Sequence, residues 1–188
     1  TSEQPPLLFN LNDLQKEANK KYGFPAAKTL SVAQALYETR KLLTYPRTDS
    51  RHMTKDLAGT IPSRLSALAP VSEYTPLVAT AQKTGIPGKR YVDNSKVSDH
   101  TALIPTEIKP DLGKLTPDEL KVYDLVVRRF LAIFYPPARY KQTRVITVAA
   151  EETFLTTGKV ELDKGWKAVY APEKEEEEKA VTIPPLSQ

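Results

Sequence analysis

The sequence "KTLSVAQALYETRKLLTYPRTDS" (residues 28–50) joins a helical pattern to an extended run and a polar segment. Its first half spaces four apolar or aromatic side chains along one helical face, which predicts a helix over residues 28–40. These side chains are Leu30, Ala33, Leu36 and Tyr37. The apolar "KLLTY" that follows is β-prone and stops at Pro46, which restricts the residue before it to extended backbone. We therefore expect Tyr45 to lie at the end of an extended segment.

A second helix is predicted upstream of this stretch. Asn12, followed three residues later by Gln15, resembles a helix-start signature, and Gly23 ends the apolar pattern. The expected helix covers about residues 13–22. Two helices joined by a tight glycine-containing turn form a candidate helix-turn-helix, although most helix pairs with short turns are packed hairpins.

Further helices are expected downstream. Thr54 and Thr75 mark two short helices, the first interrupted by Pro62. The glycine-, proline- and polar-rich residues 84–100 predict a surface loop. The strongest helical pattern covers residues 116–135 and must stop before the following "PPAR". In that helix Thr116 is the expected N-cap, Pro117 takes the first position and Glu119 completes a capping box.

The hydrophobic period changes after Arg139. From Lys141 the chain alternates in short β-prone runs, which we expect to be broken at Gly158 and Gly165. Near residues 173–179, "EKEEEEK" gathers five glutamates, which is typical of a solvated loop or linker.

The predicted fold class is α+β. A mainly α-helical domain with a helix-turn-helix core is expected over residues 5–139. A partial antiparallel β unit, with the acidic loop, is expected over residues 140–188.

Composition sets broad limits on the function. The chain has 188 residues, a formal net charge of +4 and no cysteine, so it has no disulfide framework and no thiolate zinc site. Because five acidic residues are concentrated near the end, the rest of the chain is more basic than the total suggests. This balance is compatible with a polyanionic partner such as nucleic acid. No apolar run is long enough to span a bilayer, and the first residues do not resemble a signal peptide.

Tyr45 and Arg47 together suggest phosphodiester chemistry. A phenol is a weak nucleophile at neutral pH unless a cation or a base assists it. Two residues apart on an extended strand, both side chains would point to the same side and could hold one phosphate between a phenol oxygen and a guanidinium. A tyrosine near a strand end is more commonly a packing residue, so this spacing alone is weak support for catalysis.

The surrounding motifs resemble those of type IA DNA topoisomerases, and most closely the topoisomerase III branch of that family. The matching motifs are "KTLSVAQALYE", "LLTYPRTDS" and "SDHTALIPT", with "FYPPARY" and "GWKAVY" further along. They occur in the family's order and extend over nearly the whole chain. The resemblance implies an enzyme that changes DNA topology without ATP, with a winged-helix or CAP-like helical domain that carries the catalytic tyrosine.

The resemblance also assigns roles to individual residues. It implies that Tyr45 cuts one strand of single-stranded DNA and holds its 5′ phosphate covalently. Arg47 would contact the scissile phosphate and stabilise its charge in the transition state. His100 matches the family histidine that lies near the active site and contacts the DNA backbone. The remaining candidates, expected to orient the site and its phosphate, are Thr48, Asp49 and Ser50. His52 matches no family position.

Magnesium is expected to bind elsewhere. Members of the family carry an acidic Toprim domain, whose glutamate and paired aspartates hold Mg²⁺ in the intact enzyme. No D-x-D pair of that type occurs here, so the chain is expected to be an excised piece that binds no cofactor and is inactive alone. The expected partners are single-stranded DNA and, for the intact enzyme, a helicase. We expect a monomer in the bacterial cytoplasm, associated with the nucleoid and not with a membrane.

Two alternatives stay open at this point. A non-enzymatic helix-turn-helix module could place residues 28–40 in a major groove, where Lys28 and Gln34 would face the bases. Other tyrosine enzymes of DNA fit less well. Tyrosine recombinases need an H-x-x-R motif and relaxases a His-apolar-His pair, and neither His52 nor His100 lies in such a motif.

Overall fold

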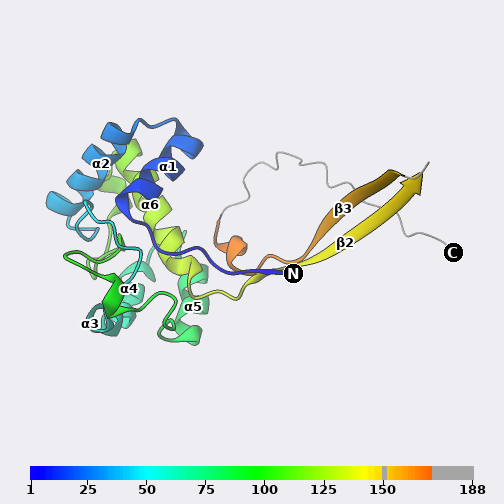
Figure 1. Cartoon of the computed structure of the whole chain (residues 1–188). Helices are drawn as coiled ribbons and strands as arrows, with labels where there is room; N and C mark the ends of the chain where they lie inside the picture. Colours follow the sequence, from blue (N-terminus) through cyan, green and yellow to red (C-terminus); the bar gives the residue numbers. More distant parts are fainter. Residues whose placement is uncertain (150–151, 171–188) are drawn as a thin grey trace. The chain divides into compact units, whose positions relative to one another are not determined.

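The computed structural model describes residues 1–149 and 152–170 (Figure 1). The chain divides into two compact units. One unit is Pro6–Tyr135 and is mainly helical, whereas the other combines Thr1–Pro5 with the segment that begins at Pro136. Helices and an antiparallel sheet are therefore both present, as the predicted α+β class requires. The predicted acidic loop at residues 173–179 lies outside the described residues.

Helix α1 (Leu11–Tyr22) starts earlier than its sequence pattern suggested. The N-cap is Asn10, whose side chain accepts a 2.8 Å hydrogen bond from the Asp13 amide, so the expected signature at Asn12 is wrong. The helix ends at Gly23, whose φ of 68° lies in the left-handed region that favours glycine.

Helix α2 (Ala26–Glu38) follows after a short turn and packs against α1 and α6. Its buried positions are Thr29, Ala33 and Leu36. Leu30 and Tyr37, which the pattern placed on the same face, are only half-buried. The Tyr37 ring is therefore not fully enclosed in the core and can contact neighbouring side chains at the surface. The helix-turn-helix assignment of α1 and α2 stays a prediction.

Three short helices form the next layer: α3 (Lys55–Gly59), α4 (Ile61–Leu68) and α5 (Thr75–Thr84). The Thr54 side chain caps α3 by accepting from the Leu57 amide at 3.2 Å. Pro62 lies in the first turn of α4 and so belongs to a new helix. The long loop beyond α5 includes the 3₁₀ helices η1 (Asn94–Lys96) and η2 (Leu112–Lys114).

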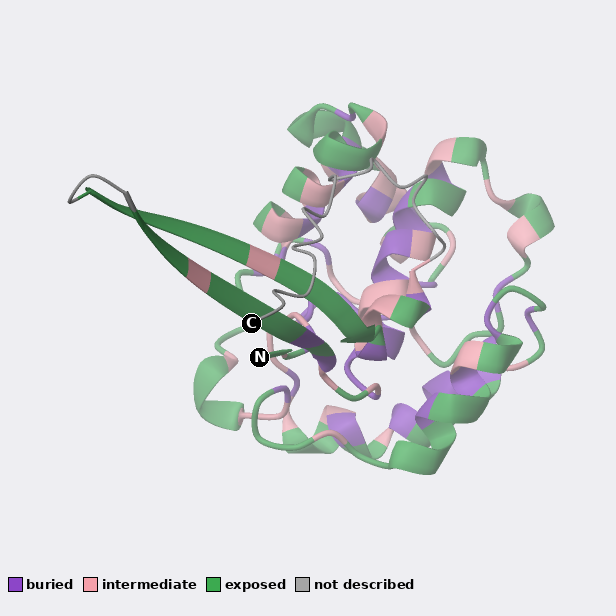
Figure 2. Ribbon diagram, turned by 90° about the vertical axis from the view of Figure 1, so that its right-hand side faces the viewer, coloured by how far each residue is buried: buried purple, intermediate pink, exposed green. Residues whose placement is uncertain are grey.

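Helix α6 (Pro117–Ala132) forms the centre of the helical core. Its predicted capping box is present: Thr116 Oγ1 accepts from the Glu119 amide at 3.2 Å, and the Thr116 amide donates to Glu119 Oε2 at 2.9 Å. Arg40, which follows the C-cap of α2, donates to the same carboxylate at 3.0–3.2 Å. In Figure 2 the buried residues lie mainly on the helices, and the long strands are almost entirely exposed.

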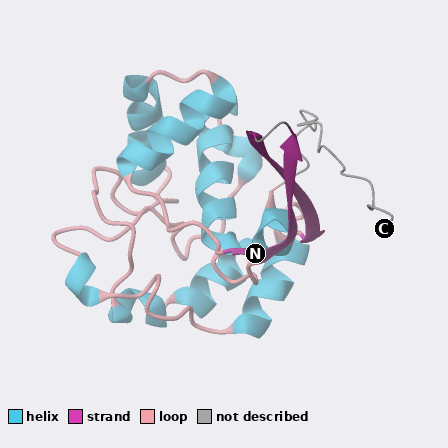
Figure 3. Cartoon of the chain, turned by 45° about the vertical axis from the view of Figure 1, so that its right-hand side comes forward, coloured by secondary structure: helices cyan, strands magenta, loops and turns pink. Residues whose placement is uncertain are grey.

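The second unit contains the only sheet among the described residues (Figure 3). Its antiparallel order is β1 (Ser2–Glu3), β2 (Ala138–Ala149) and β3 (Glu152–Asp163). The predicted break at Gly158 is wrong, because β3 continues through it and pairs it with Thr143.

The second predicted glycine break lies where β3 gives way to η3 (Gly165–Val169). A Cβ on Gly165 would lie 2.5 Å from the carbonyl oxygens of Pro136 and Pro137, which explains why the position needs glycine. The adjacent Trp166 Nε1 donates to Glu3 O at 3.0 Å. This hydrogen bond joins η3, at the end of the β2–β3 hairpin, to β1.

Candidate active site

The segment before Tyr45 pairs with the "ALIPT" segment of the downstream motif. The Thr44 amide donates to Ile104 O and the Thr106 amide to Leu42 O, both at 3.0 Å, so that Leu43 forms an isolated antiparallel bridge with Pro105. The two family motifs, distant in sequence, are thus side by side in the fold.

The extended geometry does not continue past Tyr45. The backbone bends at Pro46 and Arg47, and the Thr48 amide donates to Pro46 O at 3.0 Å. The expectation that strand alternation sets Arg47 beside Tyr45 is therefore wrong. The direction of the Arg47 side chain is therefore set by the bend at Pro46 and Arg47, and not by strand alternation.

The Thr44 side chain strengthens the pairing of the two motifs. Its hydroxyl donates to Ala102 O and accepts from the Ile104 amide, both at 3.0 Å. Ala102 and Ile104 are buried, so these backbone groups depend on the hydroxyl for a partner. Thr44 could not be singled out from the sequence, because a threonine in a β-prone run is normally explained by strand propensity alone.

Tyr45 contacts two aromatic rings. Its ring centroid is 4.3 Å from that of His100, with the planes tilted by 44°. Tyr37 of α2 also makes an edge contact with the Tyr45 ring, at 5.4 Å and 80°. Tyr45 is half-buried and His100 is exposed, so the fold holds the phenol in place while leaving the imidazole accessible.

Thr48 and Ser50 turn their hydroxyls inward. Both residues are buried, and Thr48 Oγ1 donates to His100 O at 3.2 Å. The Ser50 amide donates back to Thr48 Oγ1 at 3.1 Å, and Ser50 Oγ donates to Lys96 O at 3.0 Å. These hydroxyls tie the tyrosine segment to the loop that carries the histidine.

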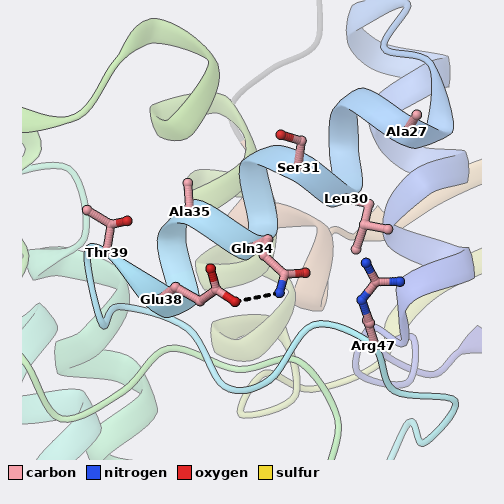
Figure 4. A pocket seen from close by; sticks show the side chains of 8 residues that line it. All are labelled: Ala27, Leu30, Ser31, Gln34, Ala35, Glu38, Thr39 and Arg47. Atoms are coloured by element: carbon pink, nitrogen blue, oxygen red, sulfur yellow. Dashed lines mark hydrogen bonds between the residues drawn. The ribbon is translucent and has the colours of Figure 1, made fainter.

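Arg47 and Asp49 are the exposed charged members of the signature. Among the described residues, neither side chain has a hydrogen-bond or ion-pair partner. Arg47 lines a groove of about 490 Å³ along α2 (Figure 4). The other lining residues are Ala27, Leu30, Ser31, Gln34, Ala35, Glu38 and Thr39. In this groove Gln34 Nε2 donates to Glu38 Oε1 at 2.7 Å. The unpaired guanidinium is available to an anion.

The other nearby cations are used within the protein. Arg51 forms a 2.6 Å ion pair with Asp13. Arg64 is 4% exposed, so its charge is buried within the helical unit. The pKa of His52 is lowered mainly by burial and secondly by the positive charge of Lys96. Both effects favour the neutral imidazole. His52 contributes to the site through its backbone carbonyl, which accepts from the Thr101 hydroxyl and the Ala102 amide at 3.0 Å.

The described part of the chain offers no cluster of three or more His, Cys, Asp or Glu side chains that could hold a metal ion. No helix in the described ranges is long and apolar enough to cross a membrane.

Known proteins match this chain over most of its length. A family model described as DNA topoisomerase matches residues 1–188. DNA topoisomerase 3 of Bacillus cereus is 49% identical over 166 residues, covering 88% of this chain and 23% of that protein. DNA topoisomerase 3 of Bacillus subtilis is 44% identical over 188 residues, covering 97% and 26% respectively. The chain spans about a quarter of the length of these curated relatives.

A solved structure supports the same grouping. Full-length topoisomerase I from Thermotoga maritima matches with a TM-score of 0.61 and 27% identity, over 93% of this chain and 28% of that one.

Proposed function

The chain belongs to the type IA DNA topoisomerases, and from this we propose that it carries the tyrosine-bearing domain of such an enzyme, with Tyr45 as the nucleophile. The proposed substrate is one strand of single-stranded DNA. The observation that carries the proposal is the position of the Tyr45 ring, whose centroid lies 4.3 Å from that of His100, two residues before the exposed and unpaired Arg47 in the chain.

The proposed reaction exchanges one phosphate ester for another. The Tyr45 phenol oxygen attacks the scissile phosphorus and loses its proton, and the bond from phosphorus to the 3′ oxygen breaks. The 3′ oxygen leaves with a proton as a free hydroxyl, and the 5′ phosphate stays on the tyrosine. Because the ester bond is conserved, the 3′ hydroxyl can attack the phosphotyrosine in the reverse direction and restore the strand without ATP.

Arg47 and His100 have complementary roles in this scheme. The Arg47 guanidinium would bind the non-bridging phosphate oxygens, where negative charge accumulates in the transition state. His100 is exposed and its ring lies tilted against that of Tyr45, so its imidazole would contact the neighbouring DNA backbone and hold the phenol ring in place.

The other signature residues would orient these groups. Thr48 and Ser50 are buried and bond to the backbone around His100, which suits an orienting role better than direct contact with phosphate. The exposed Asp49 carboxylate would repel a phosphate unless a cation lay between them.

The intact enzymes of this family use Mg²⁺. The resemblance to the family assigns the ion to an acidic Toprim domain, so we place it on another part of the intact enzyme. The chain would therefore need the remainder of a topoisomerase for strand cleavage.

A non-enzymatic helix-turn-helix module is the second candidate function. It is not favoured, because curated relatives at 44–49% identity are DNA topoisomerases. Preference for single strands over a duplex sequence would distinguish the enzyme from this module.

The test uses an intact enzyme. This chain replaces the corresponding segment of Bacillus cereus topoisomerase 3, and the chimera is incubated with a labelled single-stranded oligonucleotide and Mg²⁺. A denaturing gel then shows covalent adducts. We expect an adduct with the parent chimera, none with Tyr45→Phe, and an adduct again with Tyr37→Phe, which alters the neighbouring tyrosine. An adduct that survives Tyr45→Phe would show that another residue attacks the phosphate.

A further inference from the structure

Arg64 is a buried cation within the helical unit. It lies on α4, and its side chain is 5% exposed. Burial lowers the pKa of its guanidinium, which the nearby Glu107 carboxylate counteracts. A buried charge is costly unless its hydrogen-bonding groups are matched, so the partners of Arg64 indicate what holds it there.

Each nitrogen of the guanidinium has a different partner. Nε donates to Thr60 Oγ1 at 2.8 Å, and Nη2 forms a 3.1 Å ion pair with Glu107. Nη1 donates to the carbonyl oxygen of Pro105. The planar guanidinium therefore links the start of α4 to the segment that follows the active-site histidine.

Pro105 has a single backbone group available for this contact. Its neighbours Ile104 and Thr106 use their backbone groups to pair with Thr44 and Leu42. In an antiparallel pair, successive residues direct these groups to opposite sides, so the carbonyl of Pro105 points away from the tyrosine segment. Proline has no amide hydrogen, and the residue is buried. Arg64 supplies the donor that this buried carbonyl requires.

The bond between Arg64 and Pro105 is linked to the candidate active site through the neighbouring residues. Ile104, next to Pro105, accepts from the Thr44 amide, and Thr44 precedes Tyr45 in the chain. On its other side the same segment leads through Ala102 to His100. A shift of Pro105 would therefore displace both the segment that precedes Tyr45 and the segment that follows His100. The ring contact between Tyr45 and His100 depends on both.

We propose that Arg64 is a positioning residue for strand cleavage: its bond to the Pro105 carbonyl holds residues 102–106 against Leu43 and Thr44, and so fixes the Tyr45–His100 contact. This inference rests on the proposed function of Tyr45. Glu107 is exposed, so its ion pair with Arg64 is partly solvated and contributes little to the position of the rings.

Three variants separate positioning from stability. Arg64→Met keeps an apolar stem and removes all donors, Arg64→Lys keeps one charged donor, and Glu107→Gln removes only the ion pair. Each is made in the chain and in the Bacillus cereus chimera. The readouts are thermal unfolding, the imidazole NMR resonances of the chain, oligonucleotide affinity, and single-turnover cleavage at a temperature where all variants are folded. The chain has only two histidines, so the His100 resonances can be assigned.

In Arg64→Met we expect the ring-current shift of His100 by Tyr45 to decrease and cleavage to slow by about tenfold to a hundredfold, because small displacements of a nucleophile are costly. Oligonucleotide affinity should stay near the parent value. Arg64→Lys should recover part of the cleavage rate, and Glu107→Gln should behave like the parent.

The proposal is wrong if folded Arg64→Met has a lower unfolding temperature but keeps the parent His100 shift and cleavage rate, since Arg64 would then only stabilise the fold. If Arg64→Met does not fold, Arg64→Lys decides. Parent-like resonances and cleavage in that variant contradict the proposal, and a loss of both supports it. If the parent chimera forms no adduct, the proposed function fails, while the NMR comparison still decides whether Arg64 fixes the rings.

Discussion

The ring of Tyr45 lies 4.3 Å from that of His100, and the backbone carbonyl of His100 accepts from Thr48 of the tyrosine segment at 3.2 Å. The histidine is therefore tied to the tyrosine segment through both its side chain and its backbone. Such double attachment restricts the imidazole even though its residue lies in an exposed loop. Tyr45 and His100 would therefore keep their relative positions if this unit moved as a rigid body.

Thr44→Val should damage the site without altering its charge. The substitution removes the hydroxyl that donates to Ala102 O and accepts from the Ile104 amide, leaving two buried backbone groups unpaired. We expect the free energy of unfolding to fall by about 2 kcal/mol and adduct formation by the chimera to slow. Thr44→Ser, which keeps the hydroxyl, is the matched control. Chemical denaturation and the adduct assay measure the two effects, and equal behaviour of the Val and Ser variants would contradict the prediction.

Arg47→Ala should affect chemistry and leave the fold almost unchanged. The Arg47 guanidinium is exposed and unpaired among the described residues, so the free energy of unfolding should change by less than about 0.5 kcal/mol. Cleavage should fall by about 10²–10³, the usual cost of removing one donor to transition-state charge.

Arg51→Ala is the control for this prediction, because its cation is already paired with Asp13. It should cleave like the parent in single-turnover kinetics. If both substitutions lowered cleavage equally, a general loss of positive charge would explain the effect and Arg47 would have no specific role.

Local signals in the sequence predicted the helices better than the site. The capping box of Thr116 and Glu119 and the glycine stop at Gly23 act between near neighbours, and both occur in the structure. The prediction of Asn12 as the cap was wrong because two nearby asparagines can both cap this helix. Tertiary contacts favour Asn10, since the amide of the next residue, Leu11, donates to Thr48 O.

The arrangement of the site depends on contacts that no periodicity encodes. The motifs around Tyr45 and His100 could be found separately, but their pairing through Thr44 joins distant segments. Arg64 could not be singled out in advance, because a sequence does not tell which arginine meets a buried proline carbonyl. Gly158 failed as a strand break for the opposite reason, since pairing with Thr143 outweighs the weak strand propensity of glycine.

Acid should weaken the contact between Arg40 and Glu119. Burial opposes ionisation of Glu119, but the hydrogen bonds from Arg40 and from the Thr116 amide outweigh burial and lower the pKa of the carboxyl. A lowered carboxyl pKa stabilises the fold above the unfolded-state value of about 4, and this contribution disappears as the pH falls through the lower folded-state value.

Glu119→Gln should therefore reduce the free energy of unfolding by about 2 kcal/mol at neutral pH, since it weakens hydrogen bonds to a charged group. The difference from the parent should shrink as the pH drops below the ordinary carboxyl range. Denaturation curves between neutral and acidic pH measure it, with Glu73→Gln as an exposed control. A difference that stayed constant with pH would show that the charge of Glu119 does not stabilise the fold.

Two buried tyrosines should respond in opposite ways to loss of their hydroxyls. Tyr123 is fully buried on α6, and its hydroxyl has no partner among the described residues. Tyr74 is 1% exposed, and its hydroxyl donates to Asp124 at 3.1 Å. Tyr123→Phe removes an unsatisfied polar group and should leave the free energy of unfolding unchanged or raise it by up to about 1 kcal/mol, whereas Tyr74→Phe should lower it by about 1–2 kcal/mol. Thermal and denaturant unfolding of both variants provide the comparison. A loss in Tyr123→Phe as large as that in Tyr74→Phe would mean that the Tyr123 hydroxyl is hydrogen-bonded in solution.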